Sequence, residues 1–294
     1  MLGLPDGITA CLFDMDGVVT KTAVVHAAAW KQMFDEFLRV WSARNGREFV
    51  PFDSVRDYDE YVDGKPRLDG TESFLQSRGI QLPEGTTSDA PGTPTVQGLS
   101  NRKNELVLEV LQRDGVEVYP GSRRYLDAVR KAGLKTAIVS SSANTEAVLK
   151  AGGVADLFDV RVDAQVATER GLQGKPAPDT YLEAARMLGV DAANAAVFED
   201  ALVGVAAGRA GKFGFVVGVD RAGQADELRA RGADIVVKDL GDLLLPLLLP
   251  KRPSSPSSLC KGRKCPRRAL AAHRTRRCAN DHERAVWRGA LEPQ

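Results

Sequence analysis

Cysteine is scarce in this chain of 294 residues, and most of it lies near the C-terminal end. Cys11 is the only cysteine before residue 260, and the other three are Cys260, Cys265 and Cys278. This distribution excludes a disulfide framework for the body of the protein. It favours a reducing compartment, and we expect a cytoplasmic protein.

Long hydrophobic runs are also lacking. An apolar run at residues 243–249 is interrupted by Pro246 and falls short of the about 20 apolar residues that a membrane-spanning helix needs. The first ten residues carry neither the basic nor the apolar segment of a signal peptide. With 43% hydrophobic and 27% charged residues, the chain has the composition of a globular protein with a substantial core. We therefore expect no membrane partner.

The whole chain has almost no excess of charge of either sign, because its formal net charge is +1. Residues 251–294 hold twelve of the forty Lys and Arg but three of the thirty-nine Asp and Glu. This leaves 28 basic and 36 acidic residues in residues 1–250, a net charge of −8. An acidic body argues against a nucleic-acid-binding surface and suits a divalent cation.

The segment 251–294 differs from the rest of the chain. A Pro- and Ser-rich linker at residues 253–258 precedes a basic stretch without apolar periodicity, and we predict a disordered tail. Nucleic-acid contact is one alternative. Zinc binding is another, although no standard paired spacing is present, and a shifted reading frame would give a similar composition. The possible zinc ligands are Cys260, Cys265, His273, Cys278 and His282.

Two aspartates follow an apolar stretch, residues 8–13, that has the pattern of a buried strand. Asp14 and Asp16 are separated by one residue and are followed by Gly17, which permits a sharp turn. In open α/β sheets, ligands bind beyond the carboxyl ends of the strands. One carboxylate at such a position can attack a substrate while the other moves protons. An ordinary acidic turn after a strand has the same pattern, so the pair needs support from the rest of the chain.

Residues 22–115 carry helical patterns and no clear buried strand, and we predict that they form a helical insertion. Apolar residues at helical spacing predict one helix over residues 22–40 and another over 101–114. Residues 63–70 are typical of a turn, and residues 82–98, rich in Gly, Pro, Ser and Thr, are typical of a long mobile loop.

From residue 116 onward, short apolar strands alternate with helices. The pattern predicts strands over residues 136–139, 160–162, 195–198, 215–219 and 234–237, and helices over 122–132, 144–151 and 180–188. Such alternation produces a parallel, doubly wound sheet. We therefore predict an α/β fold with a Rossmann-like core, residues 1–21 and 116–245, and an inserted α-helical cap, residues 22–115.

Further polar groups fall at the ends of these strands or in loops on the same side of the sheet. They are Ser140, Ser142, Asn144, Lys175, Glu199 and Asp200. Together with Asp14 and Asp16 they provide the acidic nest, hydroxyl group and cation that Mg²⁺ and a phosphoryl group require. Each alone has an ordinary explanation as a helix cap, a rigid loop or a partner of a helix dipole. Their joint order and spacing favour the functional interpretation.

These motifs resemble the haloacid dehalogenase superfamily, and within it the β-phosphoglucomutase-like branch with a helical cap. The resemblance covers about residues 8–240. It rests on four motifs in order, which are Asp14–Thr20, Ser140, Lys175–Asp179, and Glu199–Asp200 with Gly204 in the following helix.

The resemblance implies roles for these residues. Asp14 is the nucleophile that forms an aspartyl-phosphate, Asp16 is the general acid/base, and Ser140 and Lys175 clamp the phosphate. Attack by a carboxylate divides a difficult displacement into two easier ones, and Mg²⁺ limits the repulsion between that carboxylate and a dianionic phosphate. The implied ligands of Mg²⁺ are Asp14, the carbonyl of Asp16, and Asp200, with Glu199 alongside.

The predicted cap also carries elements that resemble the mutase-like branch. His26 and the turn that contains Gly64 and Arg67 resemble cap elements that accompany Asp16 and bind the distant phosphate of a bisphosphorylated sugar. Without the family context, a packed histidine and a solvated turn would explain them. Thr22 lies in the hinge, and Ser142 with Asn144 resembles the substrate loop. Two departures from the family pattern are Lys21, where related sequences often have Asp, and Pro66, which stiffens the cap turn.

The function implied by the resemblance is Mg²⁺-dependent phosphotransfer on a small sugar phosphate, converting β-glucose 1-phosphate to glucose 6-phosphate through a bisphosphate. A sugar-phosphate phosphatase with the same nucleophile is the first alternative. The second is a non-catalytic binding module whose basic tail contacts nucleic acid. For the enzyme we expect a monomer with a sugar phosphate as its partner and with neither membrane nor nucleic acid.

Overall fold

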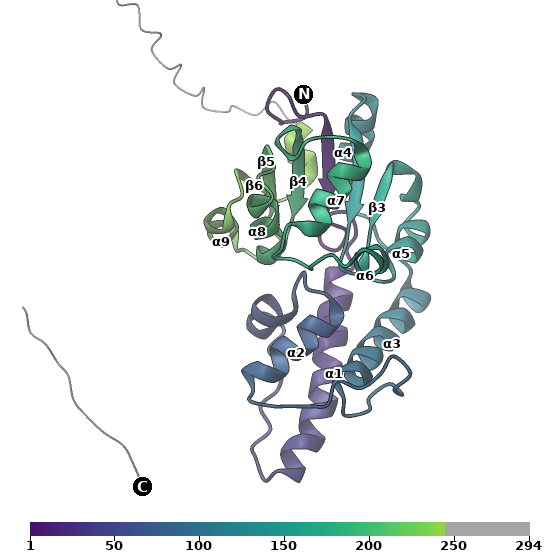
Figure 1. Cartoon of the computed structure of the whole chain (residues 1–294), viewed down its shortest axis with the longest axis vertical. Helices are drawn as coiled ribbons and strands as arrows, with labels where there is room; N and C mark the ends of the chain where they lie inside the picture. Colours follow the sequence, from purple (N-terminus) through teal and green to yellow (C-terminus); the bar gives the residue numbers. More distant parts are fainter. Residues whose placement is uncertain (245–294) are drawn as a thin grey trace, which may run out of the picture. The chain divides into compact units, whose positions relative to one another are not determined.

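Six parallel strands form the core of the computed structural model, which describes residues 1–244 (Figure 1). Their order across the sheet is β3-β2-β1-β4-β5-β6. The strands are β1 (Ala10–Phe13), β2 (Lys135–Val139), β3 (Val160–Val162), β4 (Ala195–Glu199), β5 (Phe215–Val219) and β6 (Ile235–Val237). The predicted doubly wound α/β core is therefore confirmed.

Helices connect the strands and cover both faces of the sheet (Figure 1). The α-helices from residue 120 onward are α4 (Pro120–Lys131), α5 (Thr145–Ala151), α6 (Ala164–Arg170), α7 (Asp179–Leu188), α8 (Leu202–Ala210) and α9 (Ala225–Arg231). Short 3₁₀ turns are η2 (Ala155–Leu157), η3 (Ala192–Asn194) and η4 (Leu240–Leu244). Among residues 1–244, no helix has the length and apolar character that a membrane crossing requires.

The order of strands reverses at β1, because β2 and β3 extend to one side of it and β4 to β6 to the other. Phe13, the last residue of β1, is in register with Ile138 of β2 and with Phe198 of β4. A reversal of this kind leaves a crevice at the carboxyl ends of the strands. Asp14, the next residue, therefore stands at the mouth of that crevice.

Alternating side chains of β1 enter two hydrophobic clusters, one on each face of the sheet. Phe13 packs with Tyr125 of α4 and stacks on Phe198, with 4.4 Å between the ring centroids. Leu12 enters the other cluster with Tyr181 of α7. Full burial of a large apolar side chain contributes roughly 1.5–3 kcal/mol. The two clusters thus fix β1 and the aspartate that follows it.

Between β1 and α4 the chain forms a separate group of helices, as expected for an inserted cap (Figure 1). They are α1 (Ala23–Arg44), a π-helical turn η1 (Tyr58–Val62), α2 (Arg67–Ser77) and α3 (Val96–Asp114). Phe34 lies at the centre of their hydrophobic cluster, with its ring centroid 4.1 Å from that of Phe74 and 5.3 Å from those of Trp30 and Phe52. The exact boundaries of core and cap stay a prediction, and the tail, residues 251–294, lies outside the described residues.

Two segments join the cap to the core and run side by side. Thr20 forms an antiparallel bridge with Val118, and the Lys21 amide donates to the Glu117 carbonyl at 2.8 Å. The Ser122 hydroxyl donates to the Val18 carbonyl at 2.6 Å. These contacts place the hinge directly beside the turn that follows Asp14.

Three local predictions differ from the structure. α3 begins at Val96 rather than Asn101, because the Thr95 side chain caps the helix by accepting from the Gly98 amide at 2.9 Å. The predicted turn over residues 63–70 is shorter, since α2 already begins at Arg67. The seven-residue helices α6 and α9 were not anticipated, because they are too short for a clear apolar period.

Candidate active site

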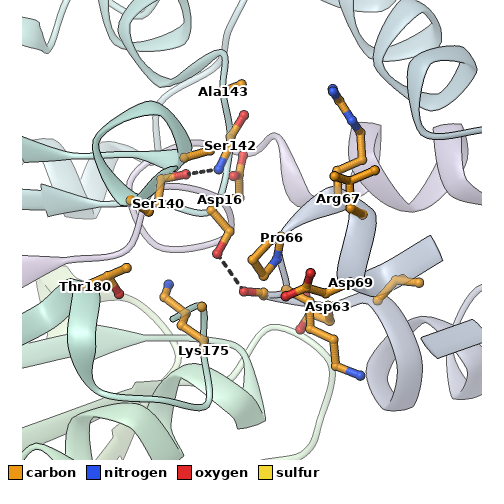
Figure 2. A pocket seen from close by; sticks show the side chains of 18 of the residues that line it. Asp16, Asp63, Pro66, Arg67, Asp69, Ser140, Ser142, Ala143, Lys175 and Thr180 are labelled. Carbon is orange, nitrogen blue, oxygen red and sulfur yellow. Dashed lines mark hydrogen bonds between the residues drawn. The ribbon is translucent and has the colours of Figure 1, made fainter. Parts of the chain in front are cut away.

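A cavity of about 1010 Å³ lies between the carboxyl ends of the strands and the cap. Figure 2 shows Ser140, Ser142 and Lys175 of the core on one side and Pro66 and Arg67 of the cap on the other. Its volume lies at the upper end of ligand pockets, which span roughly 300–1,000 Å³. All the site residues predicted from the sequence line it except Thr22 and Glu199. These two contact lining residues instead, because Thr22 donates to Asp16 and Glu199 accepts from Lys175.

Asp14 lies at the floor of this cavity and is 7% exposed. Its amide donates to the Phe198 carbonyl at 2.9 Å, and its Oδ1 accepts from Lys175 Nζ at 2.5 Å. Gly17 adopts a φ of +84°, and a Cβ at this position would lie 1.6 Å from Asp200 Oδ2. Only glycine therefore allows the turn after Asp14 to pass so close to Asp200.

Lys175 is buried and joins two carboxylates. Its Nζ lies 2.5 Å from Asp14 Oδ1 and 2.5 Å from Glu199 Oε1. Glu199 also accepts from the Tyr181 hydroxyl at 2.9 Å and from the Ala201 amide at 3.0 Å. Both oxygens of Glu199 are thus engaged within the protein, which suits a residue that positions Lys175. Tyr181 was not predicted from the sequence, because a helix aromatic has the same pattern as a core residue.

The acidic groups fit a magnesium ion. Asp14, Glu199 and Asp200 each offer a carboxylate oxygen, and these oxygens all lie within 4.8 Å of one another. Burial raises the pKa of Asp14 and of Asp200, and neighbouring carboxylates raise both further. Lys175 lowers the pKa of Asp14 but leaves an excess of negative charge. Oxygen donors with excess negative charge are the donor set that Mg²⁺ prefers.

Gly204 of α8 is a sequence motif residue whose role the structure explains. A Cβ at Gly204 would lie 1.7 Å from Glu199 Oε1 and 2.0 Å from its Cδ. The helix can therefore approach the buried Glu199 only because no side chain is present, and this approach holds Glu199 against Lys175.

We expect Gly204→Ala to lower the free energy of unfolding by about 1–3 kcal/mol, because an added methyl group must displace Glu199 in a packed interior. The melting temperature should fall by roughly 3–10 °C. Gly208→Ala in the same helix is the matched control, since its Cβ would meet its nearest neighbour at 3.2 Å. Thermal denaturation of both variants tests this, and equal melting temperatures would contradict it.

Asp16 is held by residues from the hinge and the first cap helix. The Thr22 hydroxyl donates to Asp16 Oδ1, and Thr22 is in turn 2.6 Å from the Thr20 hydroxyl. His26 Nε2 lies 3.5 Å from the same Asp16 oxygen. The structure therefore brings Thr22 and His26 together with Asp16.

Lys103 of α3 is a site residue that the sequence did not indicate. It is 5% exposed, and its Nζ lies 2.7 Å from His26 Nδ1 and 4.8 Å from the centroid of the Trp30 ring. Burial lowers the pKa of Lys103 to about 7. Burial and the charge of Lys103 lower the pKa of His26 to about 4. The charge of Arg67 lowers the pKa of both groups as well, so His26 is neutral near pH 7 and the positive charge of this part of the cap belongs to Arg67 and Lys103.

The loop after β2 contacts both the cavity and the cap. The Ser140 hydroxyl accepts from the Ser142 amide at 3.1 Å, which leaves its proton available for a ligand. Asn144 Nδ2 donates to Asn104 Oδ1 of α3 at 2.9 Å, and the Ser141 hydroxyl donates to the Gly64 carbonyl at 2.8 Å. Asn104 and Ser141 were not predicted, because only the closed arrangement of cap and core gives them partners.

The cap turn around Gly64 rests on the core. A Cβ at Gly64 would lie 2.7 Å from Val203 and 3.0 Å from Ala201, and Pro66 packs against Gly174 in the same manner. Arg67 follows as the first residue of α2, and its side chain extends away from Lys175 (Figure 2). Within residues 1–244, Arg67 Nε and Thr180 Oγ1 are buried without a hydrogen-bond partner.

Comparisons with known proteins agree with this geometry. Residues 8–212 match the family model described as a haloacid dehalogenase-like hydrolase. The chain is 54% identical over 247 residues to a β-phosphoglucomutase of Mycobacterium bovis, covering 83% of this chain and 94% of the relative. It is 33% identical over 242 residues to a β-phosphoglucomutase of Bacillus subtilis, covering 81% and 93%. A crystal structure of β-phosphoglucomutase from Clostridium difficile superposes with a TM-score of 0.62 at 25% identity, covering 80% and 93%.

Proposed function

We propose, from the premise that the chain belongs to the haloacid dehalogenase-like hydrolase family, that it is a magnesium-dependent β-phosphoglucomutase. It would convert β-glucose 1-phosphate to glucose 6-phosphate through a bisphosphorylated intermediate. The similarity to two proteins of that name, at 54% and 33% identity over nearly their whole length, supports this activity.

Two positively charged regions of one cavity carry the proposal. Lys175 and Ser140 lie beside Asp14 in the core, and Arg67 and Lys103 lie in the cap. In residues 1–244, neither Arg67 nor Lys103 has a carboxylate within ion-pairing distance. Burying a cation without a counterion is unfavourable, so a ligand anion at the cap offsets that cost. A sugar bisphosphate would place one phosphate in each region.

In this mechanism Asp14 attacks the phosphorus of the substrate, the bond from that phosphorus to the sugar oxygen breaks, and an aspartyl-phosphate forms. In the return step a sugar hydroxyl oxygen attacks the same phosphorus, and the Asp14 carboxylate is released. Lys175 and Ser140 hold the phosphoryl oxygens, and Glu199 positions Lys175. A magnesium ion, held by Asp14, the Asp16 carbonyl and Asp200, would supply charge that reduces the repulsion between carboxylate and phosphate.

Asp16 serves as general acid and base in the proposed cycle. Its carboxyl must give a proton to one sugar oxygen and accept a proton from the other, so it must stay within reach of both. Thr22 and His26 both contact its Oδ1 and hold it toward the cavity. Because these two residues belong to the hinge and the cap, closure of the cap would align Asp16 for transfer.

A sugar-phosphate phosphatase is the second candidate, and the size of the cavity favours it. A volume of about 1010 Å³ leaves room for water beside a monosaccharide phosphate. Water that reached the aspartyl-phosphate would release phosphate instead of a second sugar phosphate. A cytoplasmic location and a monomeric state remain predictions.

We expect the wild-type protein, given β-glucose 1-phosphate, Mg²⁺ and a trace of the bisphosphate, to form glucose 6-phosphate much faster than free phosphate. The reason is that both phosphates of the intermediate have a binding region in the closed cavity. Glucose 6-phosphate and inorganic phosphate are measured in the same reaction. Phosphate as the main product would replace the mutase assignment with the phosphatase.

A further inference from the structure

Asp63 is a cap carboxylate that lies against the acidic cluster of the core. It follows the π-helical turn η1 and precedes Gly64, and it lines the same cavity as Asp14 and Asp200. Gly64 packs on Ala201, the residue directly after Asp200, and its carbonyl accepts from Ser141. The cap turn that carries Asp63 is therefore seated on the loop that carries Asp200.

Asp63 also acts electrostatically on the core carboxylates. After burial, its charge is the largest influence that raises the pKa of Asp200, ahead of that of Asp14. Glu199 in turn acts on Asp63 more strongly than any other charged group. The Asp63 amide donates to the Tyr58 carbonyl at 2.9 Å, which fixes the backbone of the turn that carries Asp63. Closing the cap therefore adds a negative charge to a cluster that already has an excess of them.

We propose that Asp63 is a positioning residue that couples closure of the cap to the binding of the magnesium ion. Without the cation, its carboxylate and those of Asp14 and Asp200 repel one another and oppose closure. With the cation bound, the same carboxylate is attracted to the site and favours closure. The inference rests on the proposed function because it takes the core cluster to be a magnesium site.

This coupling differs from an ordinary contact between cap and core. The apolar contacts of Gly64 with Ala201 and Val203 favour closure whether or not a cation is present. The contribution of Asp63 to the free energy of closure depends on whether the cation is bound. Asp63 is repelled by the core carboxylates alone, and it is attracted once a divalent cation is bound among them. The substrate cavity is thereby assembled preferentially on the metal-loaded protein.

Asp69 provides a matched control. It lines the same cavity, from α2 of the cap, and burial raises its pKa as it does that of Asp63. Its charged neighbour is Lys65, and none of the core carboxylates acts on it. Figure 2 shows both aspartates on the cap side of the cavity. Asp69→Asn therefore removes a cap carboxylate without changing the charge at the metal site.

The test compares the full-length wild type with Asp63→Asn and Asp69→Asn under the same conditions at pH 8. Calorimetric titration with Mg²⁺ alone gives the dissociation constant, and thermal denaturation in a chelator gives the melting temperature of the metal-free protein. For Asp63→Asn we expect the dissociation constant for Mg²⁺ to be about 10-fold higher, because the variant loses the screened attraction of one carboxylate for the cation. We expect its melting temperature in the chelator to be at or above that of the wild type. Asp69→Asn should bind Mg²⁺ like the wild type.

The two measurements separate coupling from a structural role. A merely structural Asp63 would give a lower melting temperature in the chelator, and that result would overturn the proposal. So would unchanged Mg²⁺ affinity in Asp63→Asn while the wild type binds the ion. A wild type that binds no Mg²⁺ would overturn the magnesium site of the proposed function as well. If Asp63→Asn does not fold, Asp63→Ser is measured against the same criteria.

Discussion

Asp14→Asn is expected to abolish turnover while the protein remains folded. The asparagine keeps the shape of the side chain and the amide that donates to the Phe198 carbonyl, but its neutral amide group cannot attack phosphorus. Loss of a nucleophile commonly costs at least roughly 10⁴-fold in rate. We therefore expect formation of glucose 6-phosphate to fall to the background of the assay.

The fold of this variant should be at least as stable as that of the wild type in the absence of Mg²⁺. Burial and the neighbouring Glu199 and Asp16 raise the pKa of Asp14, so its charge opposes folding when no cation is present. Circular dichroism and thermal denaturation check the fold, and Asp127→Asn, on the exposed side of α4, is the control for activity. Residual turnover above a trace in Asp14→Asn would show that another residue is the nucleophile.

The core half of the site could be predicted from the sequence because its geometry follows from local patterns. Apolar strands end at Asp14, Ser140 and Glu199, and parallel strands must deliver those residues to one edge of the sheet. Exact strand boundaries were not needed to locate these residues, since the polar residue after each apolar run marks the end of the strand. The fold class was confirmed for the same reason.

The cap half could be predicted only where a resemblance supplied it. Lys103 stands in a helix whose sequence also suits a solvent-exposed lysine, and its partner His26 is 77 residues away in the chain. Asp63 stands in a polar turn, and only the seating of Gly64 on Ala201 reveals what its carboxylate faces. Contacts of this kind depend on how two separate groups of helices and strands meet, which no local period encodes.

Arg67→Ala is expected to separate the mutase from a phosphatase. Arg67 begins α2 and is partly buried, and its buried Nε has no hydrogen-bond partner within residues 1–244. A guanidinium can bind a phosphate through two parallel hydrogen bonds, which are stronger than neutral ones. Only a bisphosphate brings a second dianion to the cap, so the variant should lose that binding and little else.

We expect Arg67→Ala to lower the formation of glucose 6-phosphate by roughly 10- to 100-fold, the loss of one charge-assisted pair at about 1.5–3 kcal/mol. Release of phosphate from a small monoester, which has no second phosphate, should change by less than a factor of about 3. Arg67→Lys should recover part of the mutase rate, because a lysine restores the charge but not the paired geometry. Both rates are measured for wild type and the two variants with the same enzyme preparations. Equal losses of both rates would mean that Arg67 supports the cavity as a whole, and a wild type that mainly releases phosphate would make the cap cations part of a phosphatase.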